Sequence, residues 1–471
     1  MKRIPWILVA FLCFIRWASA VDVTVYNQNL GLVRETRNFR LNKGTNEIKV
    51  TDVAAQIDPT SVHFKSLTAP EAVSVIEQNF QYDLISQDKL LERYLGKEIE
   101  LERFLGASGE KREVIRGTLL SNYGGRVLQV GAKVYVNPPG NPILPELPEG
   151  LLTKPTLLWT ASSQKGGSHD CEISYLTGGL NWRADYVLVT NPQDDHMDLN
   201  AWVTIDNHSG ATYKDAKLKL VAGDVHRAEE ARAMHGVARK ALMVAEASAD
   251  QFTEKSFFEY HLYTLGRRTT LGQNETKQIE MASAADVPLK KLFIYDGAQN
   301  VGYEYNEYYR TEPGYGTQGH KKVWVMLEFK NSKDNNMGMP LPKGKIRVYK
   351  KDTDGALEFI GEDLIDHTPK DEKIRVRMGN AFDVVGERKR TAYQSDVNKR
   401  WFQESFEIIL RNHKDSDITV AVAEHLYRWT NWKVLESSQK WTKKDAQTIE
   451  FEVPVKKDAE SVVRYSVKYS W

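Results

Sequence analysis

The sequence predicts a mainly β, multi-domain protein, and three observations indicate this fold class. Apolar and polar residues alternate with a period of two in many short stretches, as they do along half-buried strands. Clusters of Gly, Asn and Asp separate these stretches, which is typical of hairpins and sandwich loops. The length of 471 residues suggests about three domains. We expect β-sandwich modules together with one small barrel-like module and one helical insertion.

The first twenty residues have the features of a secretion signal. Residues 1–3 form a short basic start, and residues 4–15 form an apolar run. Residues 18–20 read Ala-Ser-Ala, the small-x-small pattern of a signal peptidase site, so we expect cleavage between Ala20 and Val21. A hydrophobic first strand or a membrane anchor is the alternative, although the run is shorter than the roughly 20 residues of a spanning helix. The expected location is periplasmic or extracellular.

Charge and cysteine content restrict the possible functions. The chain has 64 Lys and Arg against 63 Asp and Glu, and loss of residues 1–20 would leave 61 against 63. A near-neutral chain has no basic excess to neutralise phosphates, so we expect no nucleic-acid partner. Of the two cysteines, Cys13 lies in the signal, so Cys171 is left without a disulfide partner. No later stretch is long and uncharged enough to be an integral membrane span.

The N-terminal part of the mature chain divides into two predicted segments. Residues 21–85 alternate as a small β module. Residues 86–155 begin with a short helix, for which Ser86 is the expected N-cap and Gly96 lies just past the end. Successive short strands then follow the pattern of a small closed barrel, and a run of prolines indicates a linker before the next segment.

The remainder divides into a central and a C-terminal segment. Residues 156–395 are predicted to form a larger β-sandwich. Helix formers near 228–252 interrupt the alternation, which predicts a helical insertion in a loop of this sandwich. Residues 396–471 have strands at the spacing of an immunoglobulin-like sandwich.

An ordered set of motifs carries a family resemblance. Residues 175–186 read Tyr-Leu-Thr-Gly-Gly-Leu-Asn-Trp-Arg-Ala-Asp-Tyr. Four further stretches follow in order, at 203–210, 216–224, 341–349 and 410–414. Over most of 160–471 the chain resembles the bacterial domain-of-unknown-function family 4139 (DUF4139). The resemblance implies an exported β-protein, and the family has no established catalytic residues to transfer to this chain.

The motif residues themselves predict structure. A glycine pair permits backbone angles that a Cβ would forbid, so we expect a tight turn before Trp182. Trp182 and Tyr186 should then share the inward face of a strand, with Arg183 on the other face. Gly223 similarly indicates a turn at the end of a strand. The residues with expected structural roles are Gly178, Gly179, Trp182, Arg183, Tyr186, Asn207 and Gly223.

The candidate catalytic and metal-binding residues form no complete site in the sequence. His169-Asp170-Cys171 has the residue types of a thiol nucleophile and its base, but adjacent strand residues point to opposite faces, so a buried thiol is the expectation. The run 194–196, Asp-Asp-His, and His226 could supply metal ligands, yet no paired spacing of His or Cys accompanies them. We therefore expect no catalytic residues, no metal and no cofactor.

One tyrosine-rich stretch suggests a recognition loop. Tyrosines offer a large contact area at low entropic cost and recur with Gly and Asn in binding loops, and their flat rings also suit sugar faces. The alternative is a sandwich strand followed by a Gly-rich turn. The candidate recognition residues are Tyr303, Tyr305, Tyr308, Tyr309 and Tyr315.

Three functional classes follow from these features. The leading hypothesis is a non-catalytic envelope binding or structural module whose partner is an envelope protein or glycan. The second is an outer-membrane β-barrel, because residues 463–471 alternate and end on an aromatic, although the strands are shorter than the roughly ten residues that a barrel needs. The third is an envelope hydrolase acting on glycan or peptide. The sequence leaves the oligomeric state open.

Overall fold

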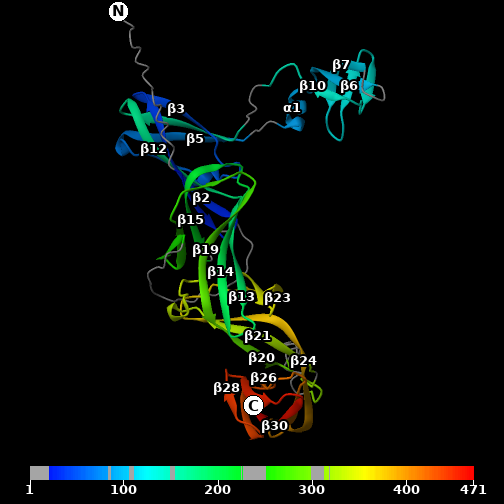
Figure 1. Cartoon of the computed structure of the whole chain (residues 1–471). Helices are drawn as coiled ribbons and strands as arrows, with labels where there is room; N and C mark the ends of the chain where they lie inside the picture. The colour runs from blue at the N-terminus through cyan, green and yellow to red at the C-terminus, as the bar shows by residue number, and fades with distance from the viewer. Residues whose placement is uncertain are drawn as a thin grey trace, which may run out of the picture. The chain divides into compact units, whose positions relative to one another are not determined.

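The computed structural model describes residues 21–82, 86–105, 111–148, 154–223, 225, 251–298, 312–317 and 319–471. These residues form 30 strands, one α-helix and three short 3-10 helices at Pro59–Ser61, Pro70–Ala72 and Lys333–Asn335 (Figure 1). The predicted mainly β class is confirmed. The predicted secretion signal, residues 1–20, and residues 228–250 of the expected helical insertion lie outside the described residues, and Phe252 already begins a strand. In the described ranges, no helix has the length and apolar character that crossing a bilayer requires.

The chain divides into two compact units, which are described separately. The first unit comprises Met1–Asn181, Asp206–Leu220 and Arg267–Lys277. The second comprises Trp182–Ile205, Val221–Gly266 and Gln278–Trp471.

Two sheets form the main body of the first unit. Five strands follow the order β15-β1-β2-β12-β4, and β18 pairs with β15. Their bounds are β1 (Val21–Tyr26), β2 (Leu30–Leu41), β4 (His63–Ser66), β12 (Gly167–Thr177), β15 (Tyr213–Ala222) and β18 (Thr269–Leu271). A three-stranded sheet, β3-β11-β5, contains β3 (Gly44–Thr51), β5 (Val73–Gln81) and β11 (Thr156–Ser163). Alternate residues of β1, β11 and β12 are buried, including Val23, Val25 and Trp159, so the two-residue period identifies the face of these strands that lies in the core.

A smaller module of the first unit begins with the predicted helix. Ser86 caps α1 (Gln87–Arg93) by accepting a hydrogen bond from the Lys89 N–H at 3.2 Å, and Gly96 beyond the helix has φ of 76°. Both features were expected from the sequence. Strands follow at β6 (Glu98–Leu105), β7 (Lys111–Ser121), β8 (Val127–Val130), β9 (Lys133–Val136) and β10 (Asn141–Ile143). Their small core contains Leu91, Tyr94, Ile99, Leu101, Leu119 and Leu128.

The expectation of a closed barrel in this module is wrong. The strands form an open sheet in the order β10-β6-β7-β8-β9, and within the described part of the chain no strand joins β9 to β10. The segment that would have to close the sheet contains Pro138, Pro139 and Pro142. Pro138 and Pro139 lie between β9 and β10 and have no N–H to donate to a ladder, whereas Pro142 lies within β10, which pairs with β6.

The five-stranded sheet in the order β19-β14-β13-β22-β23 contains the motif strand β13 (Leu180–Thr190). Its other members are β14 (His196–Asn207), β19 (Glu275–Pro288), β22 (Gly344–Lys351) and β23 (Leu357–Ile365). Trp182 and Tyr186 are buried and Arg183 is exposed, as the alternation predicted. β13 pairs with β22 in parallel, which a hairpin cannot produce. A further hairpin joins β16 (Phe252–Phe257) to β17 (Tyr260–Leu265).

The predicted glycine turns are present after β12 and after β15. The pair Gly178-Gly179 connects β12 to β13, and Gly179 has φ of 75°. A Cβ on Gly179 would lie 2.7 Å from the backbone of Ser209, so no larger residue fits there. Gly223 directly follows β15 and has φ of 133°.

A nine-stranded sheet contains the C-terminal strands in the order β27-β30-β25-β24-β21-β20-β26-β29-β28. Their bounds are β20 (Lys290–Tyr295), β21 (Lys322–Lys330), β24 (Lys373–Asp396), β25 (Trp401–Asn412), β26 (Ile418–His425), β27 (Asn431–Ser437), β28 (Trp441–Lys443), β29 (Thr448–Val455) and β30 (Ala459–Ser470). Three of these strands, β20, β21 and β24, begin before residue 396, the predicted start of the C-terminal segment. The alternating residues of β30 face the core, where Val463, Tyr465, Val467 and Tyr469 are buried.

A buried asparagine closes the turns at one end of this sheet. Asn412 ends β25, and its Nδ2 donates to the carbonyl oxygens of Ser416 at 2.9 Å, Val455 at 3.3 Å and Lys456 at 3.1 Å. Its Oδ1 accepts the N–H of Lys414 at 3.0 Å. One side chain thus satisfies backbone groups in two turns that lie far apart in the sequence.

Two further buried asparagines repeat this arrangement at other strand ends. Asn207 ends β14, and its Nδ2 donates to the carbonyls of Ala211 at 2.8 Å and Gly272 at 3.0 Å. Asn331 directly follows β21, and its Nδ2 donates to the carbonyl of Met339 at 2.8 Å. In each case Oδ1 accepts a backbone N–H of the following turn. The structural role expected for Asn207 therefore has a specific physical basis.

Replacing Asn412 by Ala should lower the free energy of unfolding by about 2–4 kcal/mol, because several buried backbone groups lose their partner at once. Urea denaturation of the mature protein measures this change. Asn398→Ala, at an exposed turn position, is the matched control and should change stability by less than about 0.5 kcal/mol. Equal effects of the two substitutions would contradict the assigned role.

Candidate functional site

The candidate site surrounds the last of the predicted recognition tyrosines. Tyr315 lies in the described segment 312–317, whereas Tyr303, Tyr305, Tyr308 and Tyr309 lie outside the described residues. The half-buried Tyr315 ring packs edge-on against Tyr427, with 5.5 Å between centroids. Segment 312–317 is held in a turn by the hydrogen bond from the Tyr315 N–H to the Glu312 carbonyl at 3.1 Å.

A glycine allows this turn to lie against the core. Gly316 has φ of 72°, and a Cβ at this position would lie 2.2 Å from the ring of Tyr427. Both the backbone angle and the lack of space therefore require glycine. Glycine therefore allows the backbone of the turn to pack directly against the Tyr427 ring.

Two ion pairs lie beneath segment 312–317 in the interior of the nine-stranded sheet's core. Arg388 on β24 donates from Nε to both carboxylate oxygens of Glu424 on β26, each at 2.9 Å. Arg428, which follows β26, pairs with Glu404 on β25 at 3.0 Å. All four side chains are at most 1% exposed. Arg390, at 15% exposed, makes a second contact to Glu404 at 3.0 Å.

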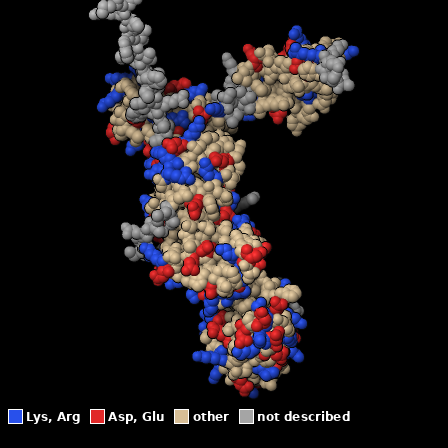
Figure 2. Space-filling view, viewed as in Figure 1, with Lys and Arg blue, Asp and Glu red and all other residues tan. Residues whose placement is uncertain are grey.

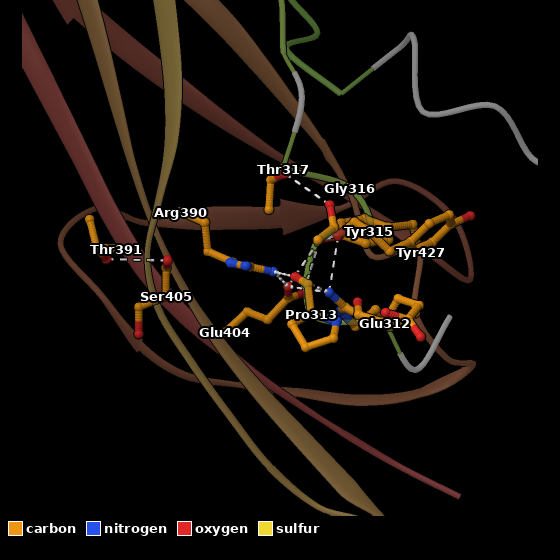
Figure 3. Close-up of polar contacts among 12 residues, drawn as sticks. Glu312, Pro313, Tyr315, Gly316, Thr317, Arg390, Thr391, Glu404, Ser405 and Tyr427 are labelled. Carbon is orange, nitrogen blue, oxygen red and sulfur yellow. Dashed lines mark hydrogen bonds and ion pairs between the residues drawn. The ribbon is translucent and has the colours of Figure 1, made fainter. Parts of the chain in front are cut away.

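The same arginines hold the backbone of segment 312–317. Arg388 donates to the carbonyl of Gly316 at 2.9 Å, and Arg428 donates to the carbonyls of Glu312 and Tyr315, each at 3.0 Å. Arg390 donates to the carbonyl of Pro313. Figure 3 shows Arg390 and Glu404 pointing toward Pro313, with Tyr427 beside Tyr315. Four carbonyl groups of one short segment are thus bound by three guanidinium groups.

Charge balance explains why carbonyl groups take part. Three guanidinium groups face two carboxylates, Glu404 and Glu424, which leaves one positive charge in excess. An uncompensated charge in a dry interior is costly, whereas carbonyl dipoles directed at it are stabilising. Segment 312–317 supplies those dipoles, so the charged interior and the position of the segment depend on each other.

Two tyrosine hydroxyl groups complete the coordination of the carboxylates. Tyr465 on β30 donates to Glu424 at 2.5 Å, and Tyr427 donates to Glu404 at 3.1 Å. Burial raises the pKa of both tyrosines above its usual range, so each hydroxyl stays protonated and remains a donor. The Arg388 guanidinium also lies 3.9 Å from the centroid of the Phe406 ring, which adds a cation–π contact. These contacts fix the geometry of the two carboxylates.

The arginine and glutamate residues of this network were missed in the sequence, although they leave a signal. Glu404 continues the inward phase of Phe402 and Phe406 along β25, and Glu424 continues that of Val422 along β26. A charged residue in the buried phase of an alternating strand must find a partner inside the fold. That phase identifies the glutamates, but it does not identify which arginines they meet.

The candidate thiol site is structural in the first unit. His169 and Cys171 share the buried face of β12, as expected. His169 Nδ1 lies 3.3 Å from Ser66 Oγ, and His169 Nε2 lies 3.1 Å from the Lys165 carbonyl oxygen, so both ring nitrogens have hydrogen-bond partners within the fold. Burial raises the pKa of the Cys171 thiol to about 11. A cysteine hydrolase requires a thiolate, which this environment disfavours.

The candidate metal ligands are engaged in other contacts. Asp194 accepts hydrogen bonds from Lys291 and Lys350, each at 2.7 Å. Burial opposes ionisation of Asp194, but these two hydrogen bonds outweigh it and lower its pKa. His196 instead contacts the neighbouring carboxylate of Asp195 at 2.9 Å, and His226 lies outside the described residues. Across the part of the chain that the structure describes, no three potential ligands cluster around a common point.

Comparison with known families assigns the C-terminal two thirds of the chain. The family model described as "Domain of unknown function (DUF4139)" matches residues 171–471. The chain belongs to this family. The resemblance inferred from the motifs is thereby confirmed, and the matched range includes all three turn-closing asparagines and the Arg–Glu network of this DUF4139 protein. Curated proteins provide no match.

Replacing Arg388 by Met should destabilise the protein by about 3–5 kcal/mol, because Glu424 would be left buried without its cationic partner. Urea denaturation of the mature protein measures the loss. Lys456→Met breaks the exposed Lys456–Asp417 pair and should leave the unfolding midpoint nearly unchanged. If the two substitutions had equal effects, the buried pair would not have the role assigned to it.

The Cys171 thiol of the folded protein should react very slowly with Ellman's reagent at pH 8, because a thiol with a pKa of about 11 is almost entirely protonated there and is also buried. Addition of denaturing urea should make the reaction fast. Cys171→Ala provides the zero-reaction control. Rapid reaction before unfolding would show instead that the thiol is accessible and activated.

Proposed function

We propose that this DUF4139 protein is an exported, non-catalytic binding or assembly module of the cell envelope, with segment 312–317 as a fixed part of its recognition surface. The observation that carries the proposal is the binding of four carbonyls in this segment by three arginines from the protein interior. Core packing alone does not explain why three arginines of the interior bind the backbone of one surface segment.

A surface segment held in one conformation is suited to binding. Association usually costs entropy because side chains and loops become ordered, and a segment that is already held avoids much of this cost. Tyr315 combines a large apolar ring with a polar tip, a combination enriched at protein interfaces. The four tyrosines at 303–309, which the sequence identified as candidates, precede this segment directly in the chain.

The charge distribution supports an envelope protein or a neutral glycan as the partner. On the face that Figure 2 shows, acidic and basic side chains are interspersed over the part of the molecule that contains the C-terminus. A strongly charged polymer would favour a field of a single sign, so an envelope protein or a neutral glycan suits this face better. The buried and protonated Cys171 supports the non-catalytic form of the proposal over a cysteine hydrolase.

Photo-crosslinking in intact cells tests the proposal. A photoreactive phenylalanine derivative in place of Tyr315 should capture a reproducible envelope partner that mass spectrometry identifies. The same derivative at Val397, an exposed position at the turn between β24 and β25, is the matched control and should not capture it. Identical capture from both positions would refute a specific surface around Tyr315.

Further experiments test the preceding tyrosines and distinguish a protein partner from a glycan partner. Replacing Tyr305, Tyr308 and Tyr309 together by Ala should weaken capture from position 315 if these tyrosines belong to the same surface. Failure of position 315 to capture any protein, with a known envelope complex as working control, would exclude a protein partner. Cosedimentation with isolated cell-wall glycan then tests the glycan form, and its failure too would overturn the proposal.

A further inference from the structure

A second feature of the C-terminal two thirds is a cavity that shares no residue with the Arg–Glu network. It has a volume of about 260 Å³ and lies entirely within the second unit. Strands β20, β21 and β24 provide one wall, and β22, β23 and the turn between β13 and β14 provide the other. The lining residues are Asp194, Lys291, Phe293, Val325, Leu327, Lys350, Ile360, Met378, Gly379, Asn380, Ala381, Phe382 and Lys414.

The charges that line the cavity are not balanced. Asp194 is shared by Lys291 and Lys350, with 2.7 Å between each ammonium nitrogen and a carboxylate oxygen. Lys414 is the third lysine of the lining, and no carboxylate of the described residues forms an ion pair with it. Three ammonium groups and one carboxylate give the lining a net charge of +2. A cavity with this charge favours an anion.

The remainder of the lining is apolar. Phe293, Leu327 and Met378 come from β20, β21 and β24, and Phe382 on β24 is 96% exposed. A phenylalanine so exposed next to a cavity leaves apolar area in water that a ligand could cover. The ligand therefore needs an apolar portion in addition to its negative charge.

The size and chemistry of the lining narrow the class of ligand. A volume of about 260 Å³ corresponds to roughly nine water-sized groups, which suits a short aliphatic chain. The lining contains lysines and no arginine, so it lacks the planar fork that holds a phosphate through two parallel hydrogen bonds. We propose that this cavity binds a small amphiphilic carboxylate, with the carboxylate at Lys414 and the aliphatic chain against the wall that ends in Phe382.

Isothermal titration of the mature protein with octanoate tests the proposal. Octanoate should bind saturably, whereas acetate, which lacks the chain, and 1-octanol, which lacks the charge, should bind much more weakly. Failure of octanoate to saturate the protein would overturn the proposal. Octanol binding as tightly as octanoate would show a merely apolar site, and tighter binding of octyl phosphate would overturn the choice of a carboxylate.

Substitutions assign the binding to this cavity. Lys414→Gln should weaken octanoate binding by about tenfold, the effect of one lost charge-assisted hydrogen bond. Lys440→Gln, at an exposed lysine outside the lining, should leave it unchanged. Asp194→Asn should strengthen binding, because it removes the carboxylate that competes for Lys291 and Lys350. Circular dichroism shows that each variant is folded, and equal effects of the first two substitutions would overturn the proposed location.

Discussion

Two buried guanidinium–carboxylate pairs, Arg388–Glu424 and Arg428–Glu404, are the interaction on which the C-terminal part of the structure depends. Removing these charges from water costs several kcal/mol per ion unless the geometry and the remaining hydrogen bonds compensate. The compensation comes from the tyrosine hydroxyls, from Arg390 and from the carbonyls of segment 312–317. A hydrophobic interior of the same shape could equal the stability, but it could not hold that segment by its backbone. The charged interior therefore specifies a surface conformation.

The three buried asparagines solve a second problem in the same way each time. A strand that ends inside the protein leaves backbone N–H and carbonyl groups without ladder partners. Asn207, Asn331 and Asn412 each lie at or just after such an end, and each donates to a distant carbonyl, that of Gly272, Pro369 and Val455 respectively. Two of them, Asn207 and Asn412, fall in the motif stretches by which the family resemblance was inferred. These motif stretches therefore contain side chains that hold the turns closed through hydrogen bonds to the backbone.

The polar groups of this chain differ in whether their partners lie within the protein. Asp194 has the residue type of a metal ligand but neutralises two lysines, and the Cys171 thiol is buried and protonated. Lys414 and Phe382 differ from these groups. Among the described residues no carboxylate forms an ion pair with Lys414, and the Phe382 ring is exposed. This contrast is the basis of the ligand site proposed at Lys414 and Phe382.

The sequence by itself determined the strand content, the inward faces and the local turns. The alternation around Trp182, the cap at Ser86 and the glycine pair before β13 all depend on residues within a few positions of one another, so local stereochemistry predicts them. The prediction of a closed barrel was wrong because, among the described residues, β9 and β10 remain the two edges of the sheet, and which strands pair is not a local property of the sequence.

Tertiary structure alone decided which strands meet. The parallel pairing of β20 with β26 joins segments more than a hundred residues apart. Arg388 and Glu424 likewise come from different strands, and the three lysines of the cavity come from three different parts of the chain. A charged residue at a buried position of an alternating strand indicates that an oppositely charged or hydrogen-bonding partner lies inside the fold. The identity of that partner depends on strand order, because long-range pairing is set by the packing of the whole sheet and not by the residues on either side of the charge.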